Sequence, residues 1–190
     1  MLRTLFLIVL SLGVALGGGI GAAWYVVDEF PGFNRLDVGQ WTAWPNAGSP
    51  EADPYARARQ SRDGLFPLGP AEGLAFTASR DAEGRPLTGN CHYRLEGETP
   101  IARLWTIFLM SGQPPRPVGG ALHSRLALRQ ADGSIAIAIG PDARPGNWIR
   151  TGRSLTAFSV SMVFYDTSVA DGSGLSEFRL PLLRRIGCDG

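Results

Sequence analysis

The sequence contains no lysine and carries almost no net charge. Its 18 cationic side chains are all arginines; they stand against 17 acidic ones, and no basic run interrupts the balance. This pattern excludes the basic patch or stripe that is typical of a nucleic-acid-binding protein. An all-arginine composition can serve the recognition of carboxylate or phosphate groups, or it can reflect the coding bias of a GC-rich genome. We adopt the second interpretation because it requires no binding site.

Histidine and cysteine are also scarce, with two of each in the chain. Cys91 and His92 are adjacent, but neighbours in a strand point to opposite faces, so they do not readily share a metal. The sequence has no Gly-x-Ser-x-Gly elbow and no phosphate-binding loop. The candidate general bases, His92 and His123, both fall on the polar side of their predicted strands. We therefore expect no metal and no cofactor.

Cys91 and Cys188 are candidates for a disulfide if the domain is exported. The bridge would tie the C-terminal tail to an inner strand. Closing a loop of about 100 residues stabilises the folded state by roughly 4–5 kcal/mol in the chain-entropy description. The alternative is a buried free thiol at Cys91 and a loosely held thiol at Cys188.

The longest apolar run, Thr4–Val27, contains no charge. About 20 apolar residues span a bilayer as a helix, so the run is long enough to cross one. Arg3 precedes it and acidic residues follow it, and the positive-inside rule then keeps the N-terminus in the cytoplasm. We therefore expect residues 1–27 to be a transmembrane anchor and the remaining chain to be exported.

The rival interpretation of this run is a cleavable signal peptide. Leu5–Leu16 would be its apolar core and Gly21-Ala22-Ala23 its cleavage site. However, the apolar run continues through Trp24 and Tyr25, which suit a membrane interface and favour a retained anchor. Both interpretations export the domain.

Gly13, Gly17 and Gly21 are spaced four residues apart, on one face of the expected helix. Small residues at this spacing let two membrane helices approach closely, which would make the anchor a dimerisation element. The alternative is that the spacing arose by chance, since glycine is common in membrane helices.

Residues 28–50 combine several prolines and glycines with Phe33, Trp41 and Trp44. Proline and glycine oppose long helices and central strands, so we expect an extended arm rather than a folded element. The aromatic side chains predict that the arm packs on the domain or at the membrane surface.

The exported domain is expected at residues 51–190 and begins with a short helix. Asp53 suits its N-cap and Pro54 its first position, while Gly64 fits its end. The pattern then changes to short segments with alternating apolar residues. The inward-facing positions are predicted to be Leu74, Phe76, Ala78, Cys91, Tyr93, Leu95, Leu122, Ser124, Leu126, Leu128, Ile135, Ile137, Ile139, Phe158, Val160, Met162 and Phe164.

The remaining segments complete this pattern. Ile101–Met110 is apolar on both faces and predicts a central strand, whereas the proline- and glycine-rich residues 114–120 predict a loop. Asp132-Gly133 and 171–174 predict turns. Phe178–Ile186 is interrupted by proline and predicts an edge strand. About seven short strands of this kind indicate an antiparallel β-sandwich of jelly-roll type.

Five residues stand out as candidates for a binding site: Arg103, Trp105, Asn147, Trp148 and Tyr165. Arg103 and Trp105 are expected on the same face of the most apolar strand, where a cation needs a partner or a ligand. One interpretation is a cleft of Trp and Arg side chains on a sheet face. The other is an arginine stem that packs over the core while its head reaches a carboxylate or water.

At these residues the chain resembles the small, membrane-anchored members of a bacterial family, domain of unknown function 1214. The resemblance covers nearly the whole chain, anchor included. The matching stretches are Asp53-Pro54-Tyr55-Ala56-Arg57-Ala58, Cys91-His92-Tyr93-Arg94-Leu95-Glu96-Gly97, Ala102-Arg103-Leu104-Trp105-Thr106, Asp132-Gly133-Ser134, Asn147-Trp148-Ile149 and Val163-Phe164-Tyr165. Leu104 and Val163 depart from the family, which often has an aromatic residue and an arginine there.

The resemblance implies a mainly β domain behind a bacterial inner-membrane anchor, with the domain in the periplasm. It also implies a partner that carries domain of unknown function 1254, and it implies no established reaction. Two functions remain open. The first is a non-catalytic binding or assembly module of the cell envelope. The second is an enzyme acting on an envelope glycan or lipid, with Arg103, His123 and Asn147 as its site residues.

Overall fold

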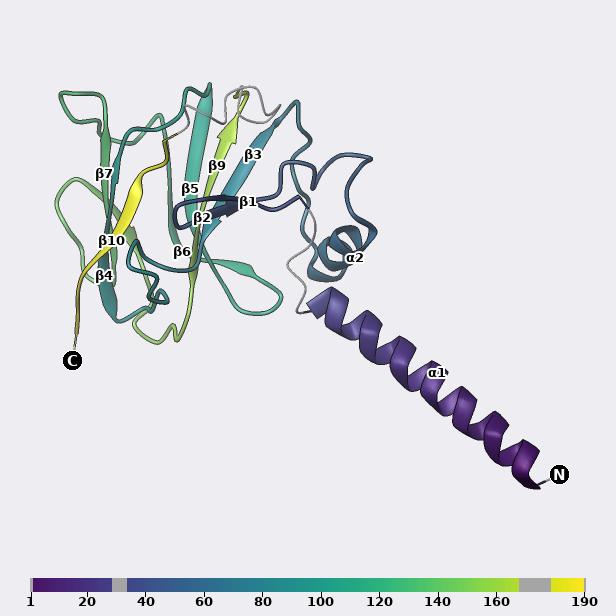
Figure 1. The fold of residues 1–190 in the computed structure, drawn as a ribbon. Helices are drawn as coiled ribbons and strands as arrows, with labels where there is room; N and C mark the ends of the chain where they lie inside the picture. Colours follow the sequence, from purple (N-terminus) through teal and green to yellow (C-terminus); the bar gives the residue numbers. More distant parts are fainter. Residues whose placement is uncertain (1, 29–33, 168–178, 190) are drawn as a thin grey trace.

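Two β-sheets face each other in the main body of the chain, and a long N-terminal helix projects from it (Figure 1). The structure is a computed structural model that describes residues 2–28, 34–167 and 179–189. The arrangement confirms the predicted mainly β fold with one long apolar helix and one short soluble helix. The turn predicted at residues 171–174 lies outside the described residues.

The larger sheet has six strands in the order β1-β2-β3-β9-β5-β6, and the smaller has four in the order β10-β4-β7-β8. The strands are β1 (Leu36–Val38), β2 (Trp41–Ala43), β3 (Gly73–Ala78), β4 (Cys91–Gly97), β5 (Leu104–Ser111), β6 (Arg116–His123), β7 (Ile135–Gly140), β8 (Asn147–Arg150), β9 (Ser159–Tyr165) and β10 (Leu182–Cys188). Neighbouring strands in the described residues are antiparallel except β7 and β8, which run parallel. The smaller sheet is therefore mixed.

The core lies between the sheets, where alternate residues of each strand meet. Trp41, Phe76 and Trp105 are its largest members from the six-stranded sheet, and Tyr93 and Ile137 face them from the other sheet. The inward positions predicted on β3, β4, β7 and β9 are buried, as alternation requires. Each large apolar side chain buried in this way contributes roughly 1.5–3 kcal/mol.

The strand predicted through Leu122, Ser124, Leu126 and Leu128 is confirmed only at Leu122, which lies in β6 and packs against the core. β6 covers residues 116–123 and so overlaps the segment 114–120 that predicted a loop, whereas Leu126 and Leu128 are 68% and 64% exposed. Proline and glycine are tolerated because β6 forms an edge of the sheet. Gly119 has a φ of 70°, and a Cβ there would lie 2.1 Å from the Arg150 carbonyl oxygen, so the strand requires glycine at this point.

The N-terminal arm contributes an edge of the larger sheet. β1 pairs with β2, and β2 continues onto β3, so the prediction of no folded element was wrong for residues 36–43. Strands of three residues are too short to show alternation, which explains the error. The predicted packing of aromatic side chains onto the domain is confirmed at Trp41, whose buried indole Nε1 donates a hydrogen bond to the Pro181 carbonyl at 2.8 Å.

β10 lies at the edge of the smaller sheet, as predicted, and begins after Pro181. Asp81 links the turn after β3 to this strand through its buried carboxylate. Its Oδ1 accepts hydrogen bonds from the backbone N–H of Arg85 at 2.8 Å and of Glu83 at 3.1 Å. Its Oδ2 lies 2.8 Å from Arg85 Nε and 3.3 Å from Arg185 Nε. Burial raises the pKa of Asp81, but these hydrogen bonds and charges lower it more, so its pKa lies below the usual value.

Asp81→Asn is expected to destabilise the protein at neutral pH and to flatten the acid dependence of its stability. The depressed folded-state pKa means that ionised Asp81 contributes stability above the unfolded pKa of about 3.9, and that this contribution is lost as the pH falls through the folded pKa. We expect a loss of about 1–3 kcal/mol at neutral pH, measured by urea denaturation at a series of pH values. An equal loss in acid and at neutral pH would contradict this role.

Candidate functional site

The five candidate site residues do not form one cleft. Arg103, Trp105 and Tyr165 belong to the six-stranded sheet or its margin, whereas Asn147 and Trp148 lie on β8 of the other sheet. The structure thus separates two groups that the sequence placed together.

Arg103 and Trp105 do not share a face in the way the sequence suggested. β5 begins at Leu104, so Arg103 precedes the strand, with a side chain that is 78% exposed and lies 3.3 Å from Asp166 Oδ2. Trp105 is 1% exposed and belongs to the core. The arginine therefore makes a solvent-exposed ion pair, a type worth little to stability.

Asn147 has a structural role, because its carboxamide is hydrogen-bonded to backbone groups of neighbouring segments. Its Oδ1 accepts a hydrogen bond from Leu128 N at 2.7 Å, and its Nδ2 donates to the carbonyls of Leu128 and Ala136 at 2.7 and 3.0 Å. These contacts join β8 both to the segment before β7 and to β7 itself. Trp148 donates from Nε1 to the Gly140 carbonyl at 3.2 Å, which fastens β8 to the end of β7.

The residues considered for catalysis are also dispersed. His123 ends β6, Arg103 precedes β5 and Asn147 begins β8 in the opposite sheet. His92, Asp142 and Asp189 do place possible ligand atoms within 4.8 Å of one another. However, Arg153 forms ion pairs with both carboxylates and offsets part of the negative charge that a cation would need, so we assign no metal to this cluster.

Cys91 and Cys188 lie opposite each other on β4 and β10, and their sulfurs are joined in a disulfide.

Helix α1 (Leu2–Asp28) contains Gly13, Gly17 and Gly21, and a Cβ at each would meet nothing within 4 Å. This open face is compatible with a second helix, and pairing stays a prediction. α1 is long and apolar enough to cross a membrane, by the criteria of length and composition that a signal sequence also meets.

An apolar groove lies on the outer face of the six-stranded sheet, and we call it the α2 groove. Its floor is formed by outward-facing residues of β3, β9 and β5, and α2 (Pro54–Asp63) with its flanking segments forms the wall. The groove has a volume of about 530 Å³. Ligand sites typically occupy roughly 300–1,000 Å³. The sequence reasoning missed this groove, although Ile101–Met110 was recognised as apolar on both faces.

The floor of the α2 groove is mostly hydrocarbon. Phe108 and Met110 on β5 and Val163 on β9 supply its apolar side chains, and exposed Ala75 on β3 leaves space between them. Ala75 and Val163 are direct partners across the β3–β9 pair. The hydroxyl groups of Thr77 and Ser161 lie 3.4 Å apart and pair with each other. The surface open to a ligand is therefore chiefly apolar. Tyr165, alone among the five candidates, lines this groove.

The wall of the α2 groove is held by well-formed helix ends, as the sequence predicted. Asp53 caps α2, accepting hydrogen bonds from the backbone N–H of Tyr55 at 3.2 Å and of Ala56 at 3.3 Å. Gly64 ends the helix with a left-handed φ of 68°. The chain then continues through Leu65 and Phe66 along the groove. The helix beside the sheet therefore has well-defined ends.

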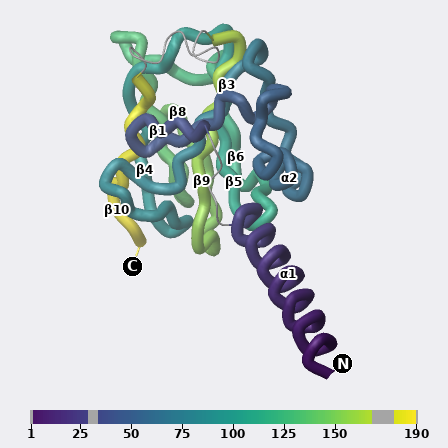
Figure 2. The backbone as a smooth tube through the Cα atoms, turned by 45° about the vertical axis from the view of Figure 1, so that its right-hand side comes forward, coloured from purple at the N-terminus to yellow at the C-terminus, as the bar shows by residue number. Residues whose placement is uncertain are grey.

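The α2 side of the groove lies beside the end of α1. Phe66, which lines the groove, is 96% exposed. Arg62 of α2 forms an ion pair with Asp28, the last residue of α1. Figure 2 shows α2 next to this end of α1. If α1 crosses a membrane, the groove and its exposed phenylalanine lie close to the bilayer surface.

The sequence model of a family described as protein of unknown function, DUF1214, matches residues 72–169. No curated protein matches the chain. Among solved structures, the VPA0106 protein from Vibrio parahaemolyticus is similar, with 18% identity, a TM-score of 0.56, and coverage of 91% of this chain and 44% of that chain. A putative uncharacterized protein from Burkholderia cenocepacia has 18% identity, a TM-score of 0.43, and coverage of 75% and 44%.

At such identity the likeness to VPA0106 shows the fold alone, and this chain spans less than half of that protein. The family match is stronger evidence, because it covers more than half of the 190 residues and most of the sandwich. The chain therefore belongs to the DUF1214 family of proteins of unknown function.

Proposed function

We propose that this chain is a membrane-tethered, exported binding module of the bacterial envelope that holds a hydrocarbon chain of a membrane lipid in the α2 groove. The observation that carries the proposal is the position of an apolar groove of about 530 Å³ beside the end of the apolar helix α1. A lipid chain could enter this groove from the bilayer surface without crossing water.

Three features support the tether and its orientation. α1 is apolar over a length that can span a bilayer, and none of the α1 residues is buried by the rest of the described protein. Arg3 precedes the apolar run and Asp28 ends the helix, which favours a cytoplasmic N-terminus. The Cys91–Cys188 disulfide suits an oxidising compartment, such as the periplasm. A mature protein that begins at Trp24 would contradict the retained anchor.

The energetics favour exchange with the bilayer over tight capture. Moving a hydrocarbon chain from water into an apolar site gains about 0.8 kcal/mol per CH₂ group. A chain that comes from a bilayer leaves an equally apolar environment, so most of that gain is absent. Contacts with the groove walls add favourable dispersion energy, whereas confinement reduces the conformational entropy of the hydrocarbon chain. These two contributions oppose each other. The module would thus hold a lipid reversibly.

Binding, rather than catalysis, fits the placement of the polar residues. The side chain of Asn147 is occupied by backbone groups, and Arg103 and His123 end or precede different strands. The family resemblance suggests a protein with domain of unknown function 1254 as the partner that receives or delivers the lipid. The Gly13, Gly17 and Gly21 face of α1 would be available to pair with that partner or a second copy.

Electron paramagnetic resonance tests the proposal with the full chain in lipid nanodiscs and a phospholipid spin-labelled near the end of its acyl chain. We expect an immobilised lipid component that a peptide of residues 1–28 in the same nanodiscs does not give. The peptide controls for lipid contacts with α1. Identical spectra for the peptide and the full chain would overturn the proposal.

A further inference from the structure

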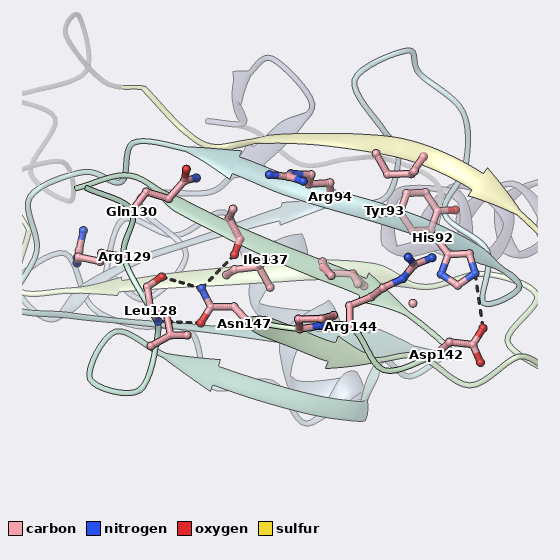
Figure 3. A pocket seen from close by; sticks show the side chains of 17 residues that line it. His92, Tyr93, Arg94, Leu128, Arg129, Gln130, Ile137, Asp142, Arg144 and Asn147 are labelled. Carbon is pink, nitrogen blue, oxygen red and sulfur yellow. Dashed lines mark hydrogen bonds and ion pairs between the residues drawn. The ribbon is translucent and has the colours of Figure 1, made fainter. Parts of the chain in front are cut away.

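A second groove lies on the outer face of the four-stranded sheet, and we call it the β7 groove (Figure 3). It has a volume of about 410 Å³. Ala136 and Ala138 of β7 form its floor and leave the middle of the sheet hollow between larger neighbours, while Gly140 lies at one end beneath His92. In Figure 1 the strands β4, β7 and β10 lie on the side of the sandwich away from α1 and α2, so this groove is separate from the lipid site.

The charges around the β7 groove are mainly positive. Arg94, Arg129 and Arg144 line it, and Asp142 is the only carboxylate among its lining residues. Asp142 is paired with Arg153, whose Nη2 lies 2.5 Å from its Oδ1 and which also pairs with Asp189. In Figure 3 Arg94 and Arg144 lie on opposite sides of the hollow.

The three arginines differ in the partners that their guanidinium groups already have. Arg94 Nε lies 2.6 Å from Glu96 Oε2, and Arg129 donates from Nη1 to the Gly133 carbonyl at 2.8 Å. Arg144 makes no ion pair with any other described residue. Its guanidinium group is therefore the one best able to bind an incoming anion.

His92 gives one end of the groove a fixed shape. A Cβ at Gly140 would lie 2.7 Å from His92 Nδ1, so the imidazole rests directly against the glycine backbone. His92 Nε2 lies 3.3 Å from Asp189 Oδ1 and 3.7 Å from Asp142 Oδ2. At the other end, the Asn147 carboxamide forms two hydrogen bonds with the backbone of Leu128 and so holds the segment that carries Arg129. Both ends are therefore built from side chains with defined partners.

We propose that the β7 groove binds a ligand through a phosphate or carboxylate group, with Arg144 as the principal contact. The planar guanidinium fork matches either oxyanion with two parallel hydrogen bonds. The small floor residues allow the rest of the ligand to lie against the sheet, next to Ile186, which is 65% exposed. Because the groove faces away from α1, the ligand comes from the space beyond the anchoring membrane. This proposal does not rest on the lipid site.

Isotope-labelled full-length protein in detergent micelles, titrated separately with inorganic phosphate and succinate, tests this site. We expect saturable shifts of the Ala136, Ala138 and Gly140 amide signals with at least one of the two probes. Saturation by phosphate alone identifies a phosphate ligand, and saturation by succinate alone identifies a carboxylate. Failure of both probes to saturate these signals would overturn the proposal.

Paired variants separate the site from general surface charge. Arg144→Gln is expected to weaken binding roughly tenfold or more, as the loss of one charge-assisted contact predicts. Arg57→Gln removes the same charge from the exposed face of α2 and should leave binding unchanged. Ala138→Trp fills the floor without changing any charge and should abolish binding, whereas Ala75→Trp fills the α2 groove and should not. Equal affinities of the two arginine variants would contradict a role for Arg144.

Discussion

Ala75→Trp is expected to abolish the immobilised lipid component while leaving the fold intact. Ala75 is exposed on the outer face of β3, opposite Val163, and it lines the hollow of the α2 groove. An indole at this position would occupy the space proposed for the acyl chain. Since the side chain points away from the core, the substitution should avoid the roughly 1–3 kcal/mol cost of overpacking a filled interior. Electron paramagnetic resonance measures the lipid, and urea denaturation measures the stability.

Ala138→Trp is the matched control for this experiment. It makes the same substitution on the outer face of the other sheet, in the β7 groove. We expect this variant to retain the immobilised lipid component in full. Loss of the component in both variants would indicate a general disturbance, and its persistence in Ala75→Trp would show that the chain lies elsewhere.

The second large effect is expected from the disulfide. Replacing both Cys91 and Cys188 by serine should lower the free energy of unfolding by about 4–5 kcal/mol, because the bridge closes a long loop in the unfolded chain. The sequence separation is 97 residues. Small domains have a total stability of about 5–15 kcal/mol, so the variant would be close to the limit of folding. Urea denaturation of the folded protein measures the difference.

Reductant provides the control for the disulfide. Reduced wild-type protein should match the double serine variant, and the variant itself should not respond to reductant. The loss should begin at β10, because Cys188 fastens the end of this edge strand to β4. Two free thiols in freshly purified protein, found by the mass shift on alkylation, would contradict the account of this bridge.

Much of the fold could be predicted because alternation and capping act locally. The apolar residues of β3, β4, β7 and β9 alternate within one strand, and Asp53 and Gly64 mark the ends of α2 from their own chemistry. The first part of β6 could not be predicted in this way. Pro117, Gly119 and Gly120 indicate a loop, and only the position of β6 at the edge of the sheet makes them compatible with a strand. The parallel pairing of β7 and β8 is likewise a property of the assembled sheet.

The candidate sites were harder to predict because they depend on which segments meet. Arg103 and Trp105 looked like neighbours on one face, but the strand begins only after Arg103. The α2 groove combines the helix region with three strands that are far apart in the sequence, and no local motif marks it. One signal was present, since β5 is apolar on both faces and only one face of a sandwich strand meets the core. The outer apolar residues Phe108 and Met110 therefore required another partner.

Photo-crosslinking with a phospholipid that carries a diazirine near the end of its acyl chain tests the central claim most directly. The full-length protein in a bilayer is irradiated, and the modified residues are identified by mass spectrometry. The account predicts crosslinks at Phe108, Met110 and Val163 in addition to those on α1, and their loss in Ala75→Trp. Crosslinks confined to α1 would contradict the proposal that the α2 groove holds a lipid chain.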